Sequence, residues 1–147
     1  MQPAPRENLF YAAFRGSFTS LLKWEDLDVF WQVLRQNAAA GWYVYAIGEP
    51  LPMQALSAEQ LKLFLDKIDA LLRQEHQEDY CGIVYTDSKT LPSMIKIFDP
   101  NNLGVQCGFS DNPPLPGWVM SLLPPQSLDS NQHLPAGRKR WWRKLWD

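Results

Sequence analysis

The fold is decided by residues 81–123, which read CGIVYTDSKTLPSMIKIFDPNNLGVQCGFSDNPPLPGWVMSLL. This stretch contains four short runs rich in β-branched and aromatic residues, separated by segments rich in Gly, Pro, Asn and Asp. Such runs and separators are typical of strands joined by tight turns. We therefore expect a four-stranded meander, with strands at 81–86, 93–99, 104–108 and 118–123.

The connection between the second and third of these strands is a strong turn signal. Residues 99–104, DPNNLG, combine side chains that hydrogen-bond their own backbone with a proline of fixed φ. This predicts a hairpin with a positive φ at Gly104. On the strand before it, Ile95 and Ile97 alternate with residues that include Lys96, so we expect one sheet face to pack on helices and the other to be partly open.

Two long amphipathic helices are expected upstream of the meander. Over 24–40 the apolar residues recur at three-and-four spacing, acidic residues occupy the first turn, and Gly41 follows the last turn. A second stripe of the same kind covers 57–77. Ser57 and Gln60 begin it with the signature of a capping box. Both helices should cover the sheet.

The remaining segments complete the expected fold. Residues 42–47, WYVYAI, lie between two glycines and predict a strand covered on both faces. A right-handed crossover through 57–77 would make this strand parallel to 81–86. Residues 1–22 contain an aromatic segment ending at Gly16, expected to be a short helix that packs on the core or, alternatively, on another subunit. The expected class is α+β, a mainly antiparallel sheet of about five strands with two long helices on one face.

The charges divide the chain unevenly. Five of the 14 Lys and Arg residues lie in the last ten positions, so residues 1–137 carry nine cations against fifteen anions, a net charge of −6. Residues 126–137 are polar and contain Pro and Gly, which is typical of a linker. We therefore divide the chain into an N-terminal aromatic segment (1–22), an α+β domain (23–125), this linker, and a basic aromatic tail (138–147).

Sequence motifs for catalysis and cofactor binding are not found. The chain contains no GxSxG, GxGxxG, GxxxxGK[ST], HExxH or CxxC pattern. His76 has no neighbour at metal-ligand spacing and is expected on the surface, whereas Cys81 and Cys107 are expected to be buried free thiols. No signal-peptide pattern and no apolar run of about eighteen residues occur, so we expect a cytoplasmic protein without a metal or cofactor.

A small enzyme or ligand-binding domain remains an alternative. Its site would be built from polar residues in the connections of the sheet, because loops at one end of a sheet can converge. Each of these residues is also an ordinary turn residue or, for the cysteine, an ordinary strand residue. The candidates are Asp87, Asp99, Asn101, Asn102, Cys107 and Asp111.

The tail, RKRWWRKLWD, is the most unusual segment of the chain. On a helix its apolar and basic side chains fall on opposite sides, but ten residues are too few for a stable isolated helix. We expect a disordered tail that folds on a partner; the alternative is that its Trp residues fold back onto the chain's own open sheet face. The residues assigned to partner binding are Arg138, Arg140, Trp141, Trp142, Arg143, Lys144, Leu145 and Trp146.

These features favour a non-enzymatic interaction, assembly or adaptor protein that docks through its tail. A protein partner with an acidic or apolar groove is the first candidate. An anionic membrane surface is the second, because basic and aromatic residues both favour it. Nucleic acid is the third, because the net charge of −6 on the rest of the chain would repel phosphate.

Overall fold

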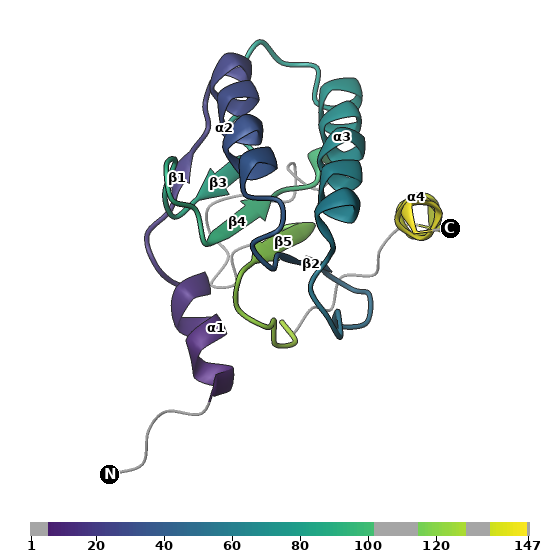
Figure 1. The fold of residues 1–147 in the computed structure, drawn as a ribbon. Coiled ribbons are helices and arrows are strands. Elements are labelled where there is room, and N and C mark those ends of the chain that lie inside the picture. Colours follow the sequence, from purple (N-terminus) through teal and green to yellow (C-terminus); the bar gives the residue numbers. More distant parts are fainter. Residues whose placement is uncertain (1–5, 102–114, 129–135, 147) are drawn as a thin grey trace, which may run out of the picture.

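The fold is α+β, as the sequence predicts, and the part of the chain that the structure describes forms four helices and a five-stranded antiparallel sheet (Figure 1). The computed structural model describes residues 6–101, 115–128 and 136–146. In chain order its elements are α1 (Arg6–Phe14), β1 (Thr19–Ser20), α2 (Trp24–Gln36), β2 (Tyr43–Ala46), α3 (Ala58–Glu75), β3 (Val84–Thr86), β4 (Met94–Ile97), β5 (Trp118–Ser121) and α4 (Ala136–Leu145).

The strand order is β1-β3-β4-β5-β2, and every neighbouring pair is antiparallel. The parallel crossover between 42–47 and 81–86 is therefore wrong. The chain passes through α3 to β3, which lies three positions from β2 in the strand order and runs antiparallel to it, and β2 pairs with β5 instead. This position covers both faces of β2, as its aromatic and β-branched residues require: Val44 and Ala46 join the core under the helices, and Tyr45 joins the core on the other face.

Strand β1 is an element that the sequence did not predict. Its two residues pair with β3, and the pairing continues as Leu21 donates to the Val84 carbonyl at 2.8 Å and Cys81 donates to the Leu22 carbonyl at 2.7 Å. Two residues are too few to display an alternating pattern. The predicted strand 104–108 and the positive φ at Gly104 lie outside the described residues.

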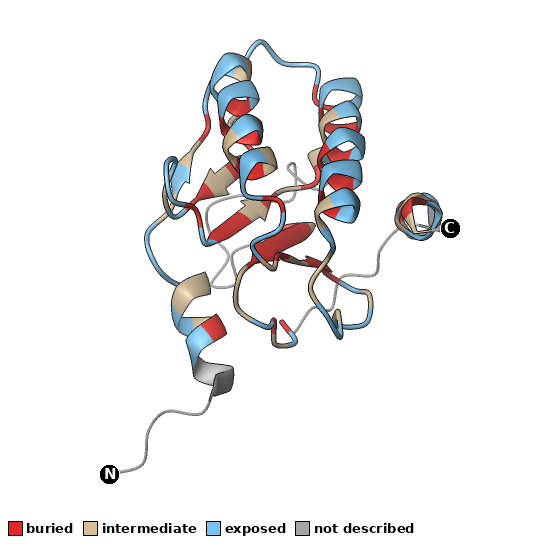
Figure 2. Cartoon of the chain, viewed as in Figure 1, coloured by how far each residue is buried: buried red, intermediate tan, exposed pale blue. Residues whose placement is uncertain are grey.

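Helices α2 and α3 lie side by side over one face of the sheet (Figure 1), with their buried residues turned toward it (Figure 2). The capping box that begins α3 is confirmed. The Ser57 hydroxyl accepts from the Gln60 backbone N–H at 3.2 Å, and the Ser57 N–H donates to the Gln60 side chain at 2.9 Å. The largest fully buried side chains of the two helices are Leu27, Phe30, Trp31, Leu34, Leu61, Phe64, Leu65, Ile68 and Leu72.

The second face of the sheet carries α1. Phe10 is fully buried there and packs in a cluster with Tyr45, Met94 and Val119, so the aromatic helix belongs to the core. The Lys96 side chain, which suggested an open face, is half-buried. Its ammonium lies 4.1 Å from the ring centroids of Phe14 and Phe18, and burial lowers its pKa.

Candidate functional site: helix α4 and its ion cluster

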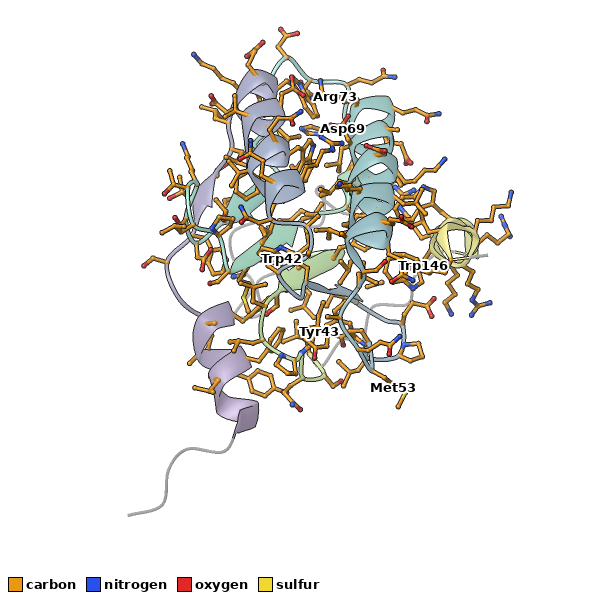
Figure 3. The ribbon with its side chains drawn as sticks, viewed as in Figure 1. Trp42, Tyr43, Met53, Asp69, Arg73 and Trp146 are labelled. Atoms are coloured by element: carbon orange, nitrogen blue, oxygen red, sulfur yellow. The ribbon has the colours of Figure 1, made fainter. Side chains whose placement is uncertain are left out.

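Helix α4 packs on its own chain through its tryptophans. The Trp141 ring lies 5.6 Å from Trp118 of β5, and the Trp142 ring lies 6.2 Å from Phe64 of α3, both edge to face. Leu145 is only 7% exposed. Figure 1 places α4 beside α3, and Figure 3 shows Trp146 on the side that faces α3. The expectation of a disordered tail is therefore wrong, because α3 and β5 supply the apolar surface that a ten-residue helix lacks alone.

The position of α4 also differs from the alternative expectation. Folding back was expected to cover the partly open sheet face, which is the face that carries α1. Instead α4 contributes to the core that contains the buried faces of α2 and α3, and it lies at the outer flank of α3. The Trp residues of α4 thus pack on a surface that is formed jointly by α3 and the sheet.

An ion cluster in which Arg138 and Asp99 are buried fixes the start of α4. Arg138 donates from Nε to Asp99 Oδ2 at 2.7 Å and from Nη2 to Asp99 Oδ1 at 2.9 Å. The same guanidinium donates from Nη1 and Nη2 to the two carboxylate oxygens of Glu75, both at 2.8 Å. The side chains of Arg138 and Asp99 are 10% and 3% exposed. One guanidinium therefore joins α4 to the end of α3 and to Asp99 in the segment that follows β4.

The hydrogen bonds of the cluster favour the charged forms of Glu75 and Arg138. The hydrogen bonds from Arg138 lower the pKa of Glu75, and those to Asp99 raise the pKa of Arg138 despite burial. The Asn101 backbone N–H also donates to Asp99 Oδ1 at 2.9 Å, and its side-chain amide donates to Glu75 Oε1 at 2.9 Å. With its carboxylates already paired, the cluster holds elements together and offers no free acid or base for proton transfer.

The cluster brings together two sets of residues that the sequence assigned to rival sites. Asp99 and Asn101 were candidates for a ligand-binding loop, whereas Arg138 was a candidate for partner binding. In the structure they satisfy one another, so neither the Asp99 carboxylate nor the Arg138 guanidinium is available at the surface. Ligand binding by the polar loops and partner binding by the tail both remain predictions, but Asp99 and Arg138 are no longer candidates for direct contact with a ligand or partner.

Asp87 lies apart from that cluster. It follows β3 and Asp99 follows β4, and these strands are antiparallel, so the two residues leave opposite ends of the sheet. Asp87 instead closes its own loop by accepting from the Ser93 hydroxyl and from the backbone N–H groups of Ser93 and Met94, the latter two at 3.0 and 3.2 Å. Burial opposes the charge, but these bonds prevail and lower the pKa of Asp87. Asn102, Cys107 and Asp111 lie outside the described residues.

The opposite side of α4 is basic and faces outward. Its cations are the exposed Arg140, Arg143 and Lys144 and the partly exposed Lys139. Figure 3 shows nitrogen-tipped side chains of α4 pointing away from α3. No ion pair joins these four cations to a described acidic residue. The amphipathic stripe predicted from the sequence is therefore used on one side for packing, and its charged side is left to solvent.

The expected surface position of His76 is wrong. This residue caps the C-terminus of α3 and is only 9% exposed, and its Nε2 lies 2.9 Å from the Cys81 carbonyl oxygen. Since a carbonyl can only accept, Nε2 carries the proton. The expectation for Cys81 is confirmed, because its thiol is buried and free and burial raises its pKa. Cys81 is therefore a protonated, inert thiol at neutral pH.

His76 and Cys81 help to line a cavity of about 240 Å³ with Tyr80, Tyr85 and Phe98. Sequence patterns do not reveal it, because these aromatic residues come from a loop, a strand and the end of another strand.

Within the described ranges no cluster of three potential metal ligands occurs, and no helix there is long and apolar enough to cross a membrane. The chain matches no protein-family model, no curated protein and no solved structure.

Proposed function

We propose that this chain is a cytoplasmic, non-enzymatic interaction protein that docks an acidic partner protein on the outward face of α4. The observation that carries the proposal is the orientation of α4. Its Trp residues face inward and Arg138 is hydrogen-bonded to Asp99 and Glu75, so Arg140, Arg143 and Lys144 are presented on a helix that is packed against its own chain. Cations presented on a rigid element lose less conformational freedom on binding than cations on a disordered tail.

The charge distribution supports an acidic protein over the other two partners. Residues 1–137 carry a net charge of −6, so the basic outward face of α4 contrasts with a remainder that is acidic on balance, and such asymmetry orients an approaching partner. Membrane insertion would draw on the Trp rings, and these pack on Phe64 and Trp118 instead. A nucleic-acid backbone is charged along its whole length, so the acidic remainder of the chain would repel it, whereas a protein partner can confine its acidic residues to the groove that meets α4.

The alternative of an enzyme or ligand site in the polar loops has less support. Asp99 is its most buried described candidate, and both carboxylate oxygens already accept hydrogen bonds from Arg138. The Asp87 carboxylate already accepts from the backbone of Ser93 and Met94. A cation or substrate would have to displace these partners before it could bind.

The test is affinity purification with quantitative mass spectrometry on three full-length proteins. The first is wild type, the second carries Arg140→Glu, Arg143→Glu and Lys144→Glu, and the third carries Lys62→Glu, Lys67→Glu and Lys89→Glu. All six positions are exposed, so the two variants have the same net charge and should both fold. Deleting 138–147 is a poorer test, because loss of Arg138 would leave Asp99 buried without its counter-charge.

A stoichiometric partner that binds wild type and the lysine control variant, but not the α4 variant, is the expected result. Binding should weaken with added salt, since exposed charges are screened over about 8–10 Å at 0.1–0.15 M. Equal capture by all three proteins would refute docking on α4. Capture of anionic vesicles or duplex DNA in preference to protein would refute the proposed class of partner.

A further inference from the structure

A cavity of about 240 Å³ lies between the C-terminal end of α3 and the strands β3 and β4, apart from the outward face of α4. Two pairs of aromatic side chains lie among its lining residues. Tyr80 stands edge to face with His76, at 6.0 Å between centroids and 83° between planes, and Tyr85 stands edge to face with Phe98, at 5.5 Å and 76°. The residues that line it are His76, Tyr80, Cys81, Gly82, Ile83, Tyr85 and Phe98.

Hydrogen bonds to backbone groups hold the walls of this cavity in place. The Cys81 carbonyl accepts from His76 Nε2 at 2.9 Å, the Gly82 N–H donates to the Leu21 carbonyl at 3.0 Å, and the Phe98 N–H donates to the Ile83 carbonyl at 2.9 Å. Gly82 has a φ of +71°, and a Cβ at that position would lie 3.3 Å from the Tyr80 ring. Glycine therefore lets the Tyr80 ring lie close to the backbone that carries the cavity wall.

The residues that line the cavity favour a positively charged ligand. Four of the residues that line the space carry rings, and neither a lysine nor an arginine belongs to the described lining residues. An aromatic face is negative, so it attracts a cation that has shed its water, and alkylated ammonium groups shed water most easily. The exposed residues Glu78 and Asp79 immediately precede Tyr80 in the chain, which adds negative charge near the rings.

We propose that this cavity is a binding site for an alkylated ammonium group, such as the trimethylammonium head of a choline-type ligand or of a methylated lysine. The ring pairs of His76 with Tyr80 and of Tyr85 with Phe98 form its walls. This assignment does not depend on α4 or on an acidic partner protein. The two sites use different residues and can be tested separately.

The probe is choline, and its matched control is 3,3-dimethyl-1-butanol, which has the same shape with carbon in place of the charged nitrogen. Both are titrated into the full-length protein and followed by NMR chemical shifts of the tyrosine and phenylalanine rings. Cation–ring attraction should make choline bind about tenfold more tightly than the neutral alcohol. The shifts should be largest at Tyr80, Tyr85 and Phe98.

Two ring variants and one control complete the test. Tyr80→Leu and Tyr85→Leu should abolish the preference for choline, whereas Tyr43→Leu should keep it, because Tyr43 lies on β2 outside the cavity lining. Tyr80 is 51% exposed, so its variant keeps the fold even if that of Tyr85 does not. Equal binding of choline and the alcohol, no binding of choline at millimolar concentration, or an unchanged preference in Tyr80→Leu would each overturn the proposal.

Discussion

Arg138 and Asp99 form a two-bond ion pair, at 2.7 and 2.9 Å, between a helix and a strand end that lie 39 residues apart in the chain. Asp99 is 3% exposed, so its charge is almost wholly removed from water. Such a charge is tolerated only when a counter-charge and hydrogen bonds meet it. The Asp99 carboxylate can therefore stay buried only while α4 is packed in place with Arg138 beside it.

The first prediction concerns this pair. Arg138→Met should lower the free energy of unfolding by about 3 kcal/mol, because Asp99 is left buried without its partner. Adding Asp99→Asn should restore part of the loss by removing the charge. Urea denaturation measures both. Arg35→Met is the control: it breaks an ion pair whose Asp66 is 65% exposed and should cost less than about 1 kcal/mol. A similar small loss for Arg138→Met would contradict the ion cluster.

The second prediction concerns the stability of the protein at acidic pH. The hydrogen bonds from Arg138 lower the pKa of Glu75 below its ordinary value of 4.5. A carboxylate whose pKa is lower in the folded state stabilises the fold fully at pH values above its ordinary, unfolded-state pKa. This stabilisation is lost as the pH falls through the pKa of the folded state. Chemical denaturation at a series of pH values should therefore show stability falling below about pH 4.5, and less steeply in Glu75→Gln.

Glu78→Gln serves as the control for this acid prediction. Glu78 is exposed and forms no ion pair with any residue that the structure describes. Its variant should follow the wild-type pH profile. If Glu75→Gln does so as well, Glu75 does not link stability to pH.

The third prediction concerns the lysine beneath α1. The Lys96 ammonium lies 4.1 Å from the ring centroids of both Phe14 and Phe18. A double-mutant cycle with Lys96→Met and Phe14→Leu should give a coupling energy of about 0.5–1 kcal/mol, the usual range for a cation over an aromatic ring near the surface. Additive losses in thermal or urea denaturation would mean that the contact contributes nothing beyond packing.

The fourth prediction compares two glycines. Gly41 has a φ of +95°, and a Cβ added there would have no neighbouring atom within 4 Å, so Gly41→Ala meets only backbone strain and should cost about 1 kcal/mol or more. Gly137 lies in the first turn of α4 with an ordinary φ, and the nearest neighbour of an added Cβ would be Arg140 Nη2 at 3.9 Å. Gly137→Ala should stabilise by up to about 1 kcal/mol. Thermal melting with opposite shifts would confirm both assignments.

The elements that the sequence predicts well are those with local chemistry. The stripes of α2 and α3 follow a period close to that of the helix, and the Ser57 capping box needs only residues three apart. Strand pairing is different. Tyr43 lies opposite Ser121, and the local sequence pattern of neither strand predicts which distant strand it pairs with.

The candidate site could be predicted only in part. The two-sided pattern of the tail indicates a helix with an apolar stripe, but the surface that receives it consists of Phe64 and Trp118, whose sequence context indicates only core residues. Arg138 and Arg140 stand in one basic run, and only the fold places the first of them, 9% exposed, beside Asp99 and Glu75. The aromatic cavity could not be predicted because its rings come from a helix cap, a loop, a strand and the end of another strand.

The pairing of β2 with β5 has a consequence for synthesis. A ribosome makes Tyr43–Ala46 long before Trp118–Ser121, yet among the described strands β5 is the only one that pairs with β2. Until β5 emerges, the nascent chain carries an aromatic strand whose backbone groups lack their partner strand, a common starting point for misassembly. A chaperone that shields apolar segments would therefore act on this chain chiefly in the interval between these two strands.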